Sequence, residues 1–366
     1  MKIYLVGGAV RDMVLGIPSH DKDYVVVGAT PDELLSLGYK QVGKDFPVFL
    51  HPKTKEEYAL ARKELPSGKG HRDFAFEFTP DITLEDDLIR RDFTCNALAY
   101  DEKTQQIIDI FGGIADIKNR TLRHISSHFS EDPLRVLRAC RFAAQLDFTI
   151  AEPTIDLCRH MVASGALSRL SAERIWQEFF KALNTNHFSK FINTMQQCNA
   201  WKAIVPELSI LPDKLTDLDN EEPLIKWAIL LQKLSPDERK NICRHLRTPM
   251  HYAEFANLCA DNLIYFQQIN GDDCSALFDL VCKVSSKFKK LKQLQDFLQF
   301  CRYYCAKKTY LYLSNLCLKT YDLLKNVKAT DMANFHDLTS SEIAEAYKEY
   351  RINLLKDHFK SCATCG

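Results

Sequence analysis

The chain has 366 residues, and its 48 lysines and arginines balance 48 aspartates and glutamates, so the formal net charge is zero. Because a generic nucleic-acid binder is usually basic, any contact with RNA must come from local clusters of charge. Hydrophobic residues form 46% of the chain, but no apolar run approaches the ~20 residues of a membrane span, so we expect a globular protein of two or more packed units without a membrane partner.

Cysteine usage indicates a reducing compartment. The 13 cysteines are an odd number and lack the spacing of a disulfide framework, so we expect reduced, buried thiols in a cytoplasmic protein. Met1 and Lys2 lead directly into a predicted strand, which leaves no room for a signal peptide. Cys362 and Cys365 form a lone C-x-x-C pair, for which a frayed tail is a better interpretation than a zinc site.

The predicted elements divide the chain at about residue 130. Before it, the residue patterns predict strands over 2–7, 22–27, 47–51, 56–62 and 106–110, and helices over 9–15, 31–37 and 84–99. Residues 63–83 are rich in Gly, Ser, Pro and charge, which predicts a mobile loop. After residue 130, apolar residues recur at three- and four-residue spacing, so we expect an almost entirely helical remainder.

The most informative stretch begins with two adjacent glycines, Gly7 and Gly8, between a predicted strand and a predicted helix. Adjacent glycines let the backbone approach a bulky anion, and the following helix directs N–H groups at it. Asp21 and Asp23 lie two residues apart at a strand start, so they share one sheet face, and such paired carboxylates suit two Mg²⁺ ions. Either feature alone is more often a common turn or a solvated strand end, but together they predict phosphoryl or nucleotidyl transfer.

Two arginine-rich segments follow. Residues 90–97 read RRDFTCNA on the predicted helix 84–99, and residues 130–141 read SEDPLRVLRACR, with Ser130 as the predicted N-cap of another helix. In the second segment Asp132, Arg135, Arg138 and Arg141 recur every three residues and share one slowly rotating face. Guanidinium groups bind phosphate oxygens in a bidentate fork. In isolation, the first segment is best interpreted as a charged helical face, and the second could be a salt-bridged surface stripe.

In the order GGAVRD, LG, DKD, RRDFTCNA and SEDPLRVLRACR, these motifs resemble the signature of the nucleotidyltransferase superfamily. The similarity is to its class II branch, which holds the CCA-adding tRNA nucleotidyltransferases and bacterial poly(A) polymerases, and it is strong over residues 1–145, moderate over 150–210 and weak beyond. It implies an α+β fold with a small mixed-sheet nucleotidyltransferase head (1–129), a helical neck that selects the nucleotide (130–210), and a helical body and tail that bind tRNA (211–366).

The resemblance also implies residue roles. Asp21 and Asp23 match the metal-binding carboxylates, and Glu57 matches a third carboxylate on an adjoining strand, a general base or metal ligand unless it is simply an exposed glutamate. Asp132 and Arg135 match the pair that reads the incoming base. The positions that match triphosphate-binding residues are Gly8, Arg11, Arg91, Arg138 and Arg141.

The chemistry of the base edges agrees with such a pair. Cytosine and adenine each present an amino donor beside a ring-nitrogen acceptor, so a carboxylate can accept from the first and a guanidinium can donate to the second. Guanine and uracil present a carbonyl where the carboxylate lies, so two acceptors would face each other. One Asp/Arg pair can therefore accept C and A and refuse G and U without a template.

Further positions separate the members of the branch. Residues 42–51 resemble the CCA-adding version, since poly(A) polymerases typically carry a basic residue where this chain has Asp45, and the intact loop 63–83 argues against enzymes that add only CC. Gln232 and Lys233 stand where long relatives carry the His-Asp pair of a phosphohydrolase domain, so we expect no such hydrolase.

The resemblance thus implies addition of C, C and A to the 3′ end of tRNA from CTP and ATP, with Mg²⁺ as the cofactor and no obligate protein partner. A poly(A) polymerase, an enzyme that adds only CC or only A, and an inactive RNA-binding relative are the alternatives. The intact Asp21/Asp23 pair speaks against the last of these.

Two basic clusters lie in the predicted body. One contains Lys283, Lys287, Lys289, Lys290 and Lys292, and the other interleaves Arg302, Lys307, Lys308 and Lys319 with Tyr303, Tyr304, Tyr310, Tyr312 and Tyr321. Lysines can bind phosphate while tyrosines stack on unpaired bases. The alternative is that the tyrosines pack inward and the lysines only face water.

Overall fold

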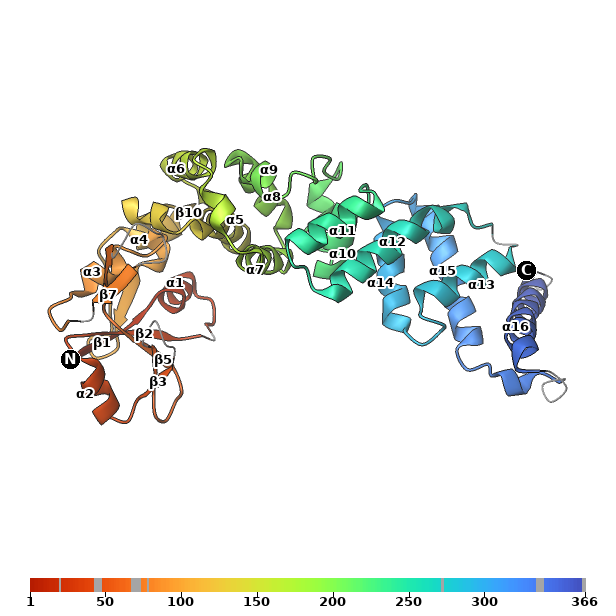
Figure 1. The fold of residues 1–366 in the computed structure, drawn as a ribbon, viewed down its shortest axis with the longest axis horizontal. Helices are drawn as coiled ribbons and strands as arrows, with labels where there is room; N and C mark the ends of the chain where they lie inside the picture. The colour runs from red at the N-terminus through yellow and green to blue at the C-terminus, as the bar shows by residue number, and fades with distance from the viewer. Residues whose placement is uncertain are drawn as a thin grey trace. The chain divides into compact units, whose positions relative to one another are not determined.

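The computed structural model describes residues 1–19, 21–42, 48–66, 74–77, 79–270, 273–333 and 339–363. They form two compact units, residues 1–206 with 216–220, and residues 207–215 with 221–366. Strands gather in the N-terminal part and helices follow (Figure 1), which confirms the predicted α+β class with a mixed sheet and a helical remainder. Among the described residues, no helix combines the length and apolarity needed to cross a membrane.

The first unit is built on a mixed sheet with the strand order β3-β4-β5-β2-β1-β8-β9. β2 runs parallel to β5, and the other neighbouring pairs in this sheet are antiparallel. Its strands are β1 (Lys2–Val6), β2 (Asp23–Val27), β3 (Lys40–Val42), β4 (Val48–Leu50), β5 (Glu57–Leu60), β8 (Leu98–Asp101) and β9 (Gln106–Asp109). Two smaller sheets pair β6 (Lys63–Pro66) with β7 (Phe74–Glu77), and β10 (Thr121–Leu122) with β11 (Thr149–Ile150).

Helices complete both units. The first unit contains α1 (Gly8–Leu15), α2 (Pro31–Ser36), α3 (Leu84–Leu88), α4 (Gly113–Lys118), α5 (Leu134–Leu146), α6 (Glu152–Ala163), α7 (Ala172–Leu183), α8 (Phe188–Gln197) and α9 (Ala200–Ile204), with short 3₁₀ turns η1 (Thr94–Asn96), η2 (Ser127–Glu131) and η3 (Ala166–Arg169). A further turn, η4 (Leu215–Leu218), falls where the chain passes between the units. The second unit contains α10 (Pro223–Leu231), α11 (Pro236–His245), α12 (Met250–Gln268), α13 (Cys274–Val284), α14 (Leu291–Arg302), α15 (Lys307–Leu324), η5 (Ala329–Asp331) and α16 (Ser340–Ala363).

Buried side chains on one face of the sheet and along α5 stabilise the first unit. Side chains alternate along β1, so Tyr4 and Val6 join a buried cluster with Val25, Ala97 and Ala99 on one face of the sheet. α5 is largely buried and packs against α7 and α8. α5 carries three of the arginines singled out in the sequence. Its packing therefore fixes the position of the backbone from which these three side chains project.

Most predicted elements of the head are present. β1, β2, β4, β5 and β9 correspond to the five predicted strands, and α1 and α2 to the first two helices. The predicted loop 63–83 is wrong in part, because β6 and β7 pair within it. The rest of that loop from 67 to 73, residue 78, residues 43–47 of the segment 42–51, and Cys365 lie outside the described residues.

The predicted helix 84–99 is wrong, because α3 ends at Leu88. The Oδ1 of Asp92 accepts a hydrogen bond from the backbone N–H of Phe93 at 2.9 Å, a local bond that competes with helix formation. η1 follows, and β8 then pairs with β1 and β9. Pairing in the sheet therefore overrides the helical periodicity of this segment.

Gly113 lets α4 approach η1 closely. A Cβ atom at Gly113 would lie 2.3 Å from the backbone oxygen of Thr94, which is the first residue of η1. η1 ends at Asn96, whose side chain accepts a hydrogen bond from Arg11. A side chain at position 113 would therefore displace a turn that carries part of the candidate site.

We predict that Gly113→Ala lowers the free energy of unfolding by about 2 kcal/mol, because main-chain atoms must shift to admit the methyl group. Gly112→Asn is the control, since Gly112 has φ +77° with nothing within 4 Å of an added Cβ, and asparagine tolerates that conformation at ~1 kcal/mol or less. Denaturant-induced unfolding measures both values. Equal destabilisation by the two variants would contradict the close approach of α4 to η1.

Candidate active site

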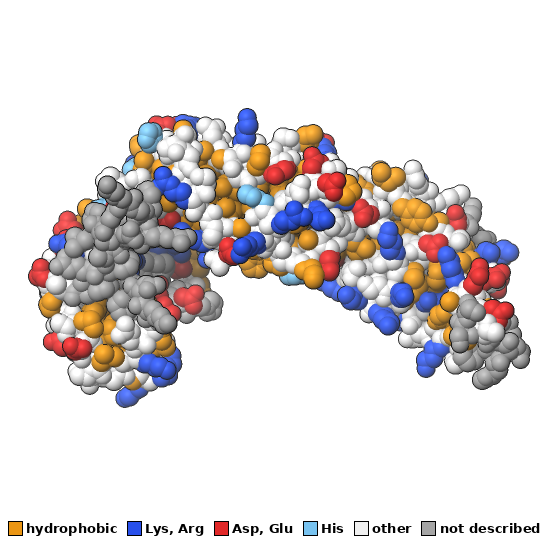
Figure 2. Space-filling view, viewed as in Figure 1, with side chains coloured by type: hydrophobic (Ala, Val, Ile, Leu, Met, Phe, Trp, Pro, Cys, Tyr) orange, Lys and Arg blue, Asp and Glu red, His pale blue; other side chains and the backbone are white. Residues whose placement is uncertain are grey.

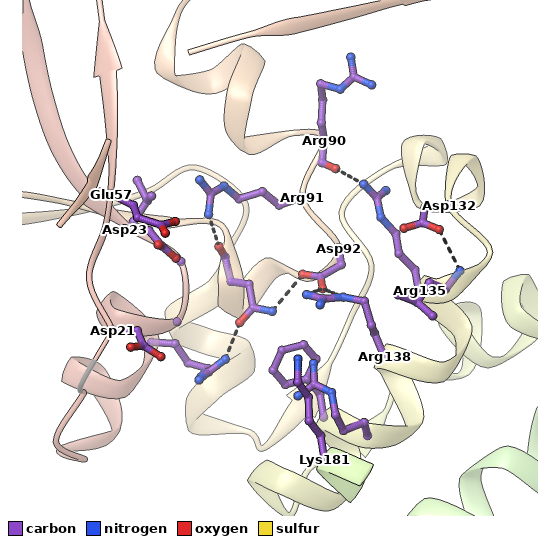
Figure 3. Close-up of a pocket in the computed structure, with 18 of the residues that line it drawn as sticks. Asp21, Asp23, Glu57, Arg90, Arg91, Asp92, Asp132, Arg135, Arg138 and Lys181 are labelled. Carbon is purple, nitrogen blue, oxygen red and sulfur yellow. Dashed lines mark hydrogen bonds and ion pairs between the residues drawn. The ribbon is translucent and has the colours of Figure 1, made fainter. Parts of the chain in front are cut away.

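A cavity of about 1060 Å³ opens in the first unit. All ten residues singled out in the sequence line it, namely Gly8, Arg11, Asp21, Asp23, Glu57, Arg91, Asp132, Arg135, Arg138 and Arg141. Figure 3 shows Asp21, Asp23 and Glu57 on one side of the cavity, Asp132 and Arg135 on the other, and Arg91 and Arg138 between them. The fold therefore brings segments separated by more than a hundred residues to one site.

The three carboxylates lie at strand ends. Asp23 begins β2 and pairs in register with Glu57, which begins the parallel strand β5, while Asp21 precedes β2 by two residues. The pKa of the Asp23 carboxyl is raised above its usual value by desolvation, which Arg91 opposes, and also by the charge of Asp21. The site therefore concentrates negative charge that a cation would neutralise.

A divalent cation fits this group of residues. Asp21 and Asp23 offer carboxylate oxygens, and a bound cation would offset both the burial and the charge of Asp21, which together raise the pKa of Asp23. Among the described residues, no three or more His, Cys, Asp and Glu side chains gather closely enough to hold a metal ion. Magnesium usually keeps several waters and binds through one or two carboxylates together with substrate phosphates, so a carboxylate pair suffices.

The glycine turn meets two arginines. Gly7 has φ 76° and precedes α1, and a Cβ there would come within 3.0 Å of Arg91 Nη1. Arg11 projects from α1, is buried, and donates from Nε to Asp12 Oδ1 at 2.9 Å and from Nη1 to Asn96 Oδ1 at 2.7 Å. The absence of side chains at the turn thus leaves room for the guanidinium groups that face the cavity.

A buried carboxylate connects this turn to α5. Asp92 is 6% exposed and accepts from Asn96 Nδ2 at 2.9 Å, and from Nε and Nη2 of Arg138 at 2.9 and 2.5 Å (Figure 3). Burial would raise the pKa of Asp92, but the charge of Arg138 and the hydrogen bonds from Asn96 and Arg138 hold it below its usual value. Asp92 is therefore ionised and fixes the direction of Arg138.

Arg141 is held in the same manner. Its Nε donates to Glu178 Oε2 at 2.5 Å, and both side chains are almost fully buried. The ring of Phe142 lies among three guanidinium groups, 5.4 Å from Arg11 Cζ, 5.3 Å from Arg138 Cζ and 3.8 Å from Arg141 Cζ. The face of an aromatic ring attracts cations, so Phe142 helps to hold three like charges close together.

The structure places Asp132 and Arg135 in the cavity but gives each a different partner. Arg135 donates from Nη1 to the backbone oxygen of His128 at 2.6 Å and from Nη2 to that of Arg90 at 2.7 Å. Asp132 accepts from the backbone N–H of Leu134 at 3.0 Å and from Arg174 Nη2 at 2.8 Å. Both side chains are thus oriented by neighbouring protein groups.

The predicted N-cap at Ser130 is wrong. Ser130 lies in η2, and its hydroxyl donates to the backbone oxygen of Ser127 at 2.8 Å, while α5 begins at Leu134. Asp132 therefore precedes the helix instead of sharing its surface with the arginines. Its Oδ1 accepts the backbone N–H of Leu134, the first residue of the helix.

Sequence reasoning missed several residues that organise the site. Asp92, Asn96 and Phe142 lay within or beside the quoted motifs but were assigned no role, and α7 contributes Arg174, Glu178 and Lys181, which drew no attention. The signal that could have found Glu178 is a charged residue among the buried positions Ile175, Phe179 and Ala182 of an amphipathic helix.

Two protein families match the chain. Residues 3–123 match the poly(A) polymerase head domain, and residues 147–211 match a probable RNA- and SrmB-binding site of polymerase A. The first match runs from the second residue of β1 through β9, the last strand of the mixed sheet, and the second covers α6 to α9.

Curated relatives match along nearly the whole chain. A CCA-adding enzyme of Coxiella burnetii is 38% identical over 97% of this chain and 95% of its own, and one of Pseudomonas putida is 40% identical over 97% and 98%. The solved structure of a Thermotoga maritima CCA-adding enzyme complexed with tRNA has the same fold, with TM-score 0.72 and 22% identity over 98% of this chain and 91% of that one. The chain belongs to the family of CCA-adding enzymes, which are tRNA nucleotidyltransferases.

Proposed function

We propose that this chain adds C, C and A to the 3′ end of tRNA from CTP and ATP, without a template and with release of pyrophosphate. One observation carries the proposal. A single cavity combines paired carboxylates, a row of fixed arginines and an Asp/Arg pair that suits the edges of C and A. Each of these groups matches one part of a nucleoside triphosphate.

The arginines are suited to the triphosphate. Arg11, Arg91, Arg138 and Arg141 line the same cavity, beside the glycine turn at Gly8. Guanidinium is always charged and binds phosphate oxygens through paired N–H groups. Because carboxylates and Phe142 already hold three of these side chains, little reorganisation is required when the anion enters.

Asp21 and Asp23 would hold the metal. Nucleotidyltransferases of this family generally use a divalent metal ion, and we assign Mg²⁺ because the donors are carboxylate oxygens. When bound, Mg²⁺ lowers the pKa of the attacking 3′-hydroxyl and neutralises charge on the leaving pyrophosphate. We assign to Glu57, which pairs in register with Asp23, the acceptance of the hydroxyl proton, since no three carboxylates among the described residues lie closely enough to share a metal ion.

Asp132 and Arg135 would select the base. The carboxylate of Asp132 has lone pairs on both oxygens beyond those used by Leu134 and Arg174, so it can accept the amino group of C or A. The guanidinium of Arg135 is fixed by the carbonyl groups of His128 and Arg90, and would donate to the ring nitrogen. The same two contacts serve both nucleotides.

We assign residues 1–129 to the catalytic head, 130–210 to the nucleotide-selecting neck, and 211–366 to tRNA binding. Lys283, Lys287, Lys289 and Lys290 are exposed around a turn anchored by the buried ring of Phe288, which supports phosphate binding. On the face seen in Figure 2, basic and acidic side chains are interspersed over the second unit, in keeping with zero net charge.

The second basic cluster is a weaker candidate for stacking on bases. Tyr321 packs near Phe288, and the hydroxyls of Tyr303 and Tyr304 donate to backbone oxygens of Lys214 and Ile229. Tyr312 is exposed.

We also propose a cytoplasmic location. It is supported by the 11 cysteines whose side chains the structure describes, which are free thiols.

A nucleotide-addition assay tests the function. The protein is incubated with tRNA that lacks CCA, with CTP alone, ATP alone or both, and Asp21→Asn serves as the inactive control. Products extended by CC with CTP, and by CCA with both nucleotides, are expected. Long A tracts would indicate a poly(A) polymerase, a stop at CC a partial enzyme, and no extension an inactive relative.

We predict a pH-dependent gain of stability in Asp23→Asn. The raised pKa of Asp23 means that its charged form is disfavoured in the folded protein. In buffer with a metal chelator, Asp23→Asn should therefore unfold at higher denaturant than the parent at pH 7. The difference should vanish as the pH falls through the pKa of Asp23, because the parent carboxyl then becomes neutral. A variant less stable than the parent at pH 7 would contradict the claim that burial and the charge of Asp21 disfavour the ionised form of Asp23 in the folded protein.

Asp132→Ala is predicted to relax base choice while lowering activity. It removes both the acceptor for the amino groups of C and A and the group that repels the carbonyls of G and U. A site built around such a polar edge can reject an unpaired analogue by roughly 10⁴-fold, so even partial relaxation is measurable as incorporation of UTP or GTP. Arg174→Ala provides the comparison, since it removes a partner of Asp132 and keeps the carboxylate. Undiminished discrimination in Asp132→Ala would place base selection elsewhere.

A further inference from the structure

α7 (Ala172–Leu183) is fixed to the nucleotide-binding side of the cavity by two ion pairs. Arg174 pairs with Asp132 at 2.8 Å and Glu178 pairs with Arg141 at 2.5 Å. Glu178 is 2% exposed, so the second pair is buried. The part of α7 that follows these contacts is therefore held rigidly against the site.

The last turn of α7 also lines this cavity, and none of its residues is among those proposed to bind the incoming nucleotide. Phe180, Lys181 and Asn184 are cavity-lining residues, and Figure 3 shows Lys181 at the edge between the metal-site carboxylates and Asp132. The cavity of about 1060 Å³ is slightly larger than the ~300–1,000 Å³ that is usual for small-molecule sites. The reaction proposed above brings two substrates to this cavity, and this wall is where the second can lie.

The chemistry of this wall is that of a single-stranded RNA site. α7 buries Ile175, Trp176, Phe179 and Leu183, yet Phe180 lies on its polar side and is 42% exposed. Lys181 and Asn184 are exposed beside it, and residues 180–185 contain no carboxylate. An exposed aromatic ring next to a cation and an amide is the combination that stacks an unpaired base and binds its phosphate.

We propose that Phe180 and Lys181 bind the unpaired 3′-terminal nucleotide of the RNA substrate, with its base stacked on Phe180 and a phosphate paired with Lys181. The proposal rests on the function proposed above, since it concerns the acceptor of the same reaction. It assigns the nucleoside triphosphate to the arginine row and the RNA end to the last turn of α7. The ion pairs from α7 to Asp132 and Arg141 would then couple the position of the RNA end to that of the incoming nucleotide.

The test is equilibrium binding of an acceptor-stem RNA hairpin that lacks CCA and ends in 2-aminopurine, whose fluorescence is quenched by stacking. The wild-type protein, without nucleotide, should quench the probe. Phe180→Leu keeps an apolar side chain without the aromatic face and should abolish the quenching, whereas Phe180→Trp should retain it. In steady-state addition, Phe180→Leu should raise KM for RNA about 10-fold and leave KM for CTP unchanged.

Lys181→Ala should weaken RNA binding and reduce its dependence on salt, because one phosphate contact is lost. Lys202→Ala, an exposed lysine of α9 that does not line the cavity, is the matched control and should bind RNA as the parent does. Unquenched probe in the wild-type protein, or an unchanged KM for RNA in Phe180→Leu, would overturn the proposal. A raised KM for CTP with KM for RNA unchanged would also overturn it, since Phe180 would then belong to the nucleotide site.

These readouts separate the site from the proposed function. If the wild-type protein quenches the probe, and Phe180→Leu does not, while neither adds any nucleotide, the RNA site is supported and only the proposed activity fails. If addition proceeds normally but the two proteins bind the probe identically, the activity stands and this site is refuted.

Discussion

The buried carboxylate of Asp92 is the contact on which the rest of the site depends. It joins Arg138 of α5 to Asn96 of η1, and through Asn96 it reaches Arg11 of α1. These groups come from three separate segments, so their arrangement cannot exist before the sheet, η1 and α5 have assembled. An ionised carboxylate in this position compensates the burial of guanidinium groups that would otherwise be costly to desolvate.

Carboxylates and one aromatic ring hold the arginines of the cavity in place before an anion binds. Arg11, Arg138 and Arg141 each bond to one carboxylate, while the centre of the Phe142 ring lies within 5.4 Å of the Cζ atom of all three. The carboxylates proposed to hold the metal show the reverse arrangement, since burial and the charge of Asp21 both disfavour the ionised form of Asp23. Arginines that are already neutralised hold their geometry without the substrate, whereas the carboxylate pair gains most when a cation arrives.

The ten residues that line the cavity could be singled out from the sequence because they lie in short contiguous motifs whose order along the chain is informative. The strands could be predicted because their apolar runs are short and bounded by turn residues. The hydrogen bonds between side chains of the cavity could not be predicted, since Arg138 and Asp92 are 46 residues apart along the chain, and Arg11 and Asn96 are 85 residues apart. Local periodicity was also misleading in the segment between Leu88 and Leu98. Pairing in the sheet replaces the helix there, and the Asp92 side chain accepts the backbone N–H of the next residue, Phe93.

Isothermal titration of CTP and ATP into Asp92→Asn tests the central claim most directly. Asparagine keeps the size of the side chain and can still bond to Asn96, but it removes the charge that aligns Arg138. If Asp92 organises the arginine row, both nucleotides should lose affinity by the same factor, about 10-fold for a charge-assisted contact, in a protein that remains folded by circular dichroism. Unchanged or tighter binding of both nucleotides would contradict the claim, because the arginines would then find the triphosphate without Asp92.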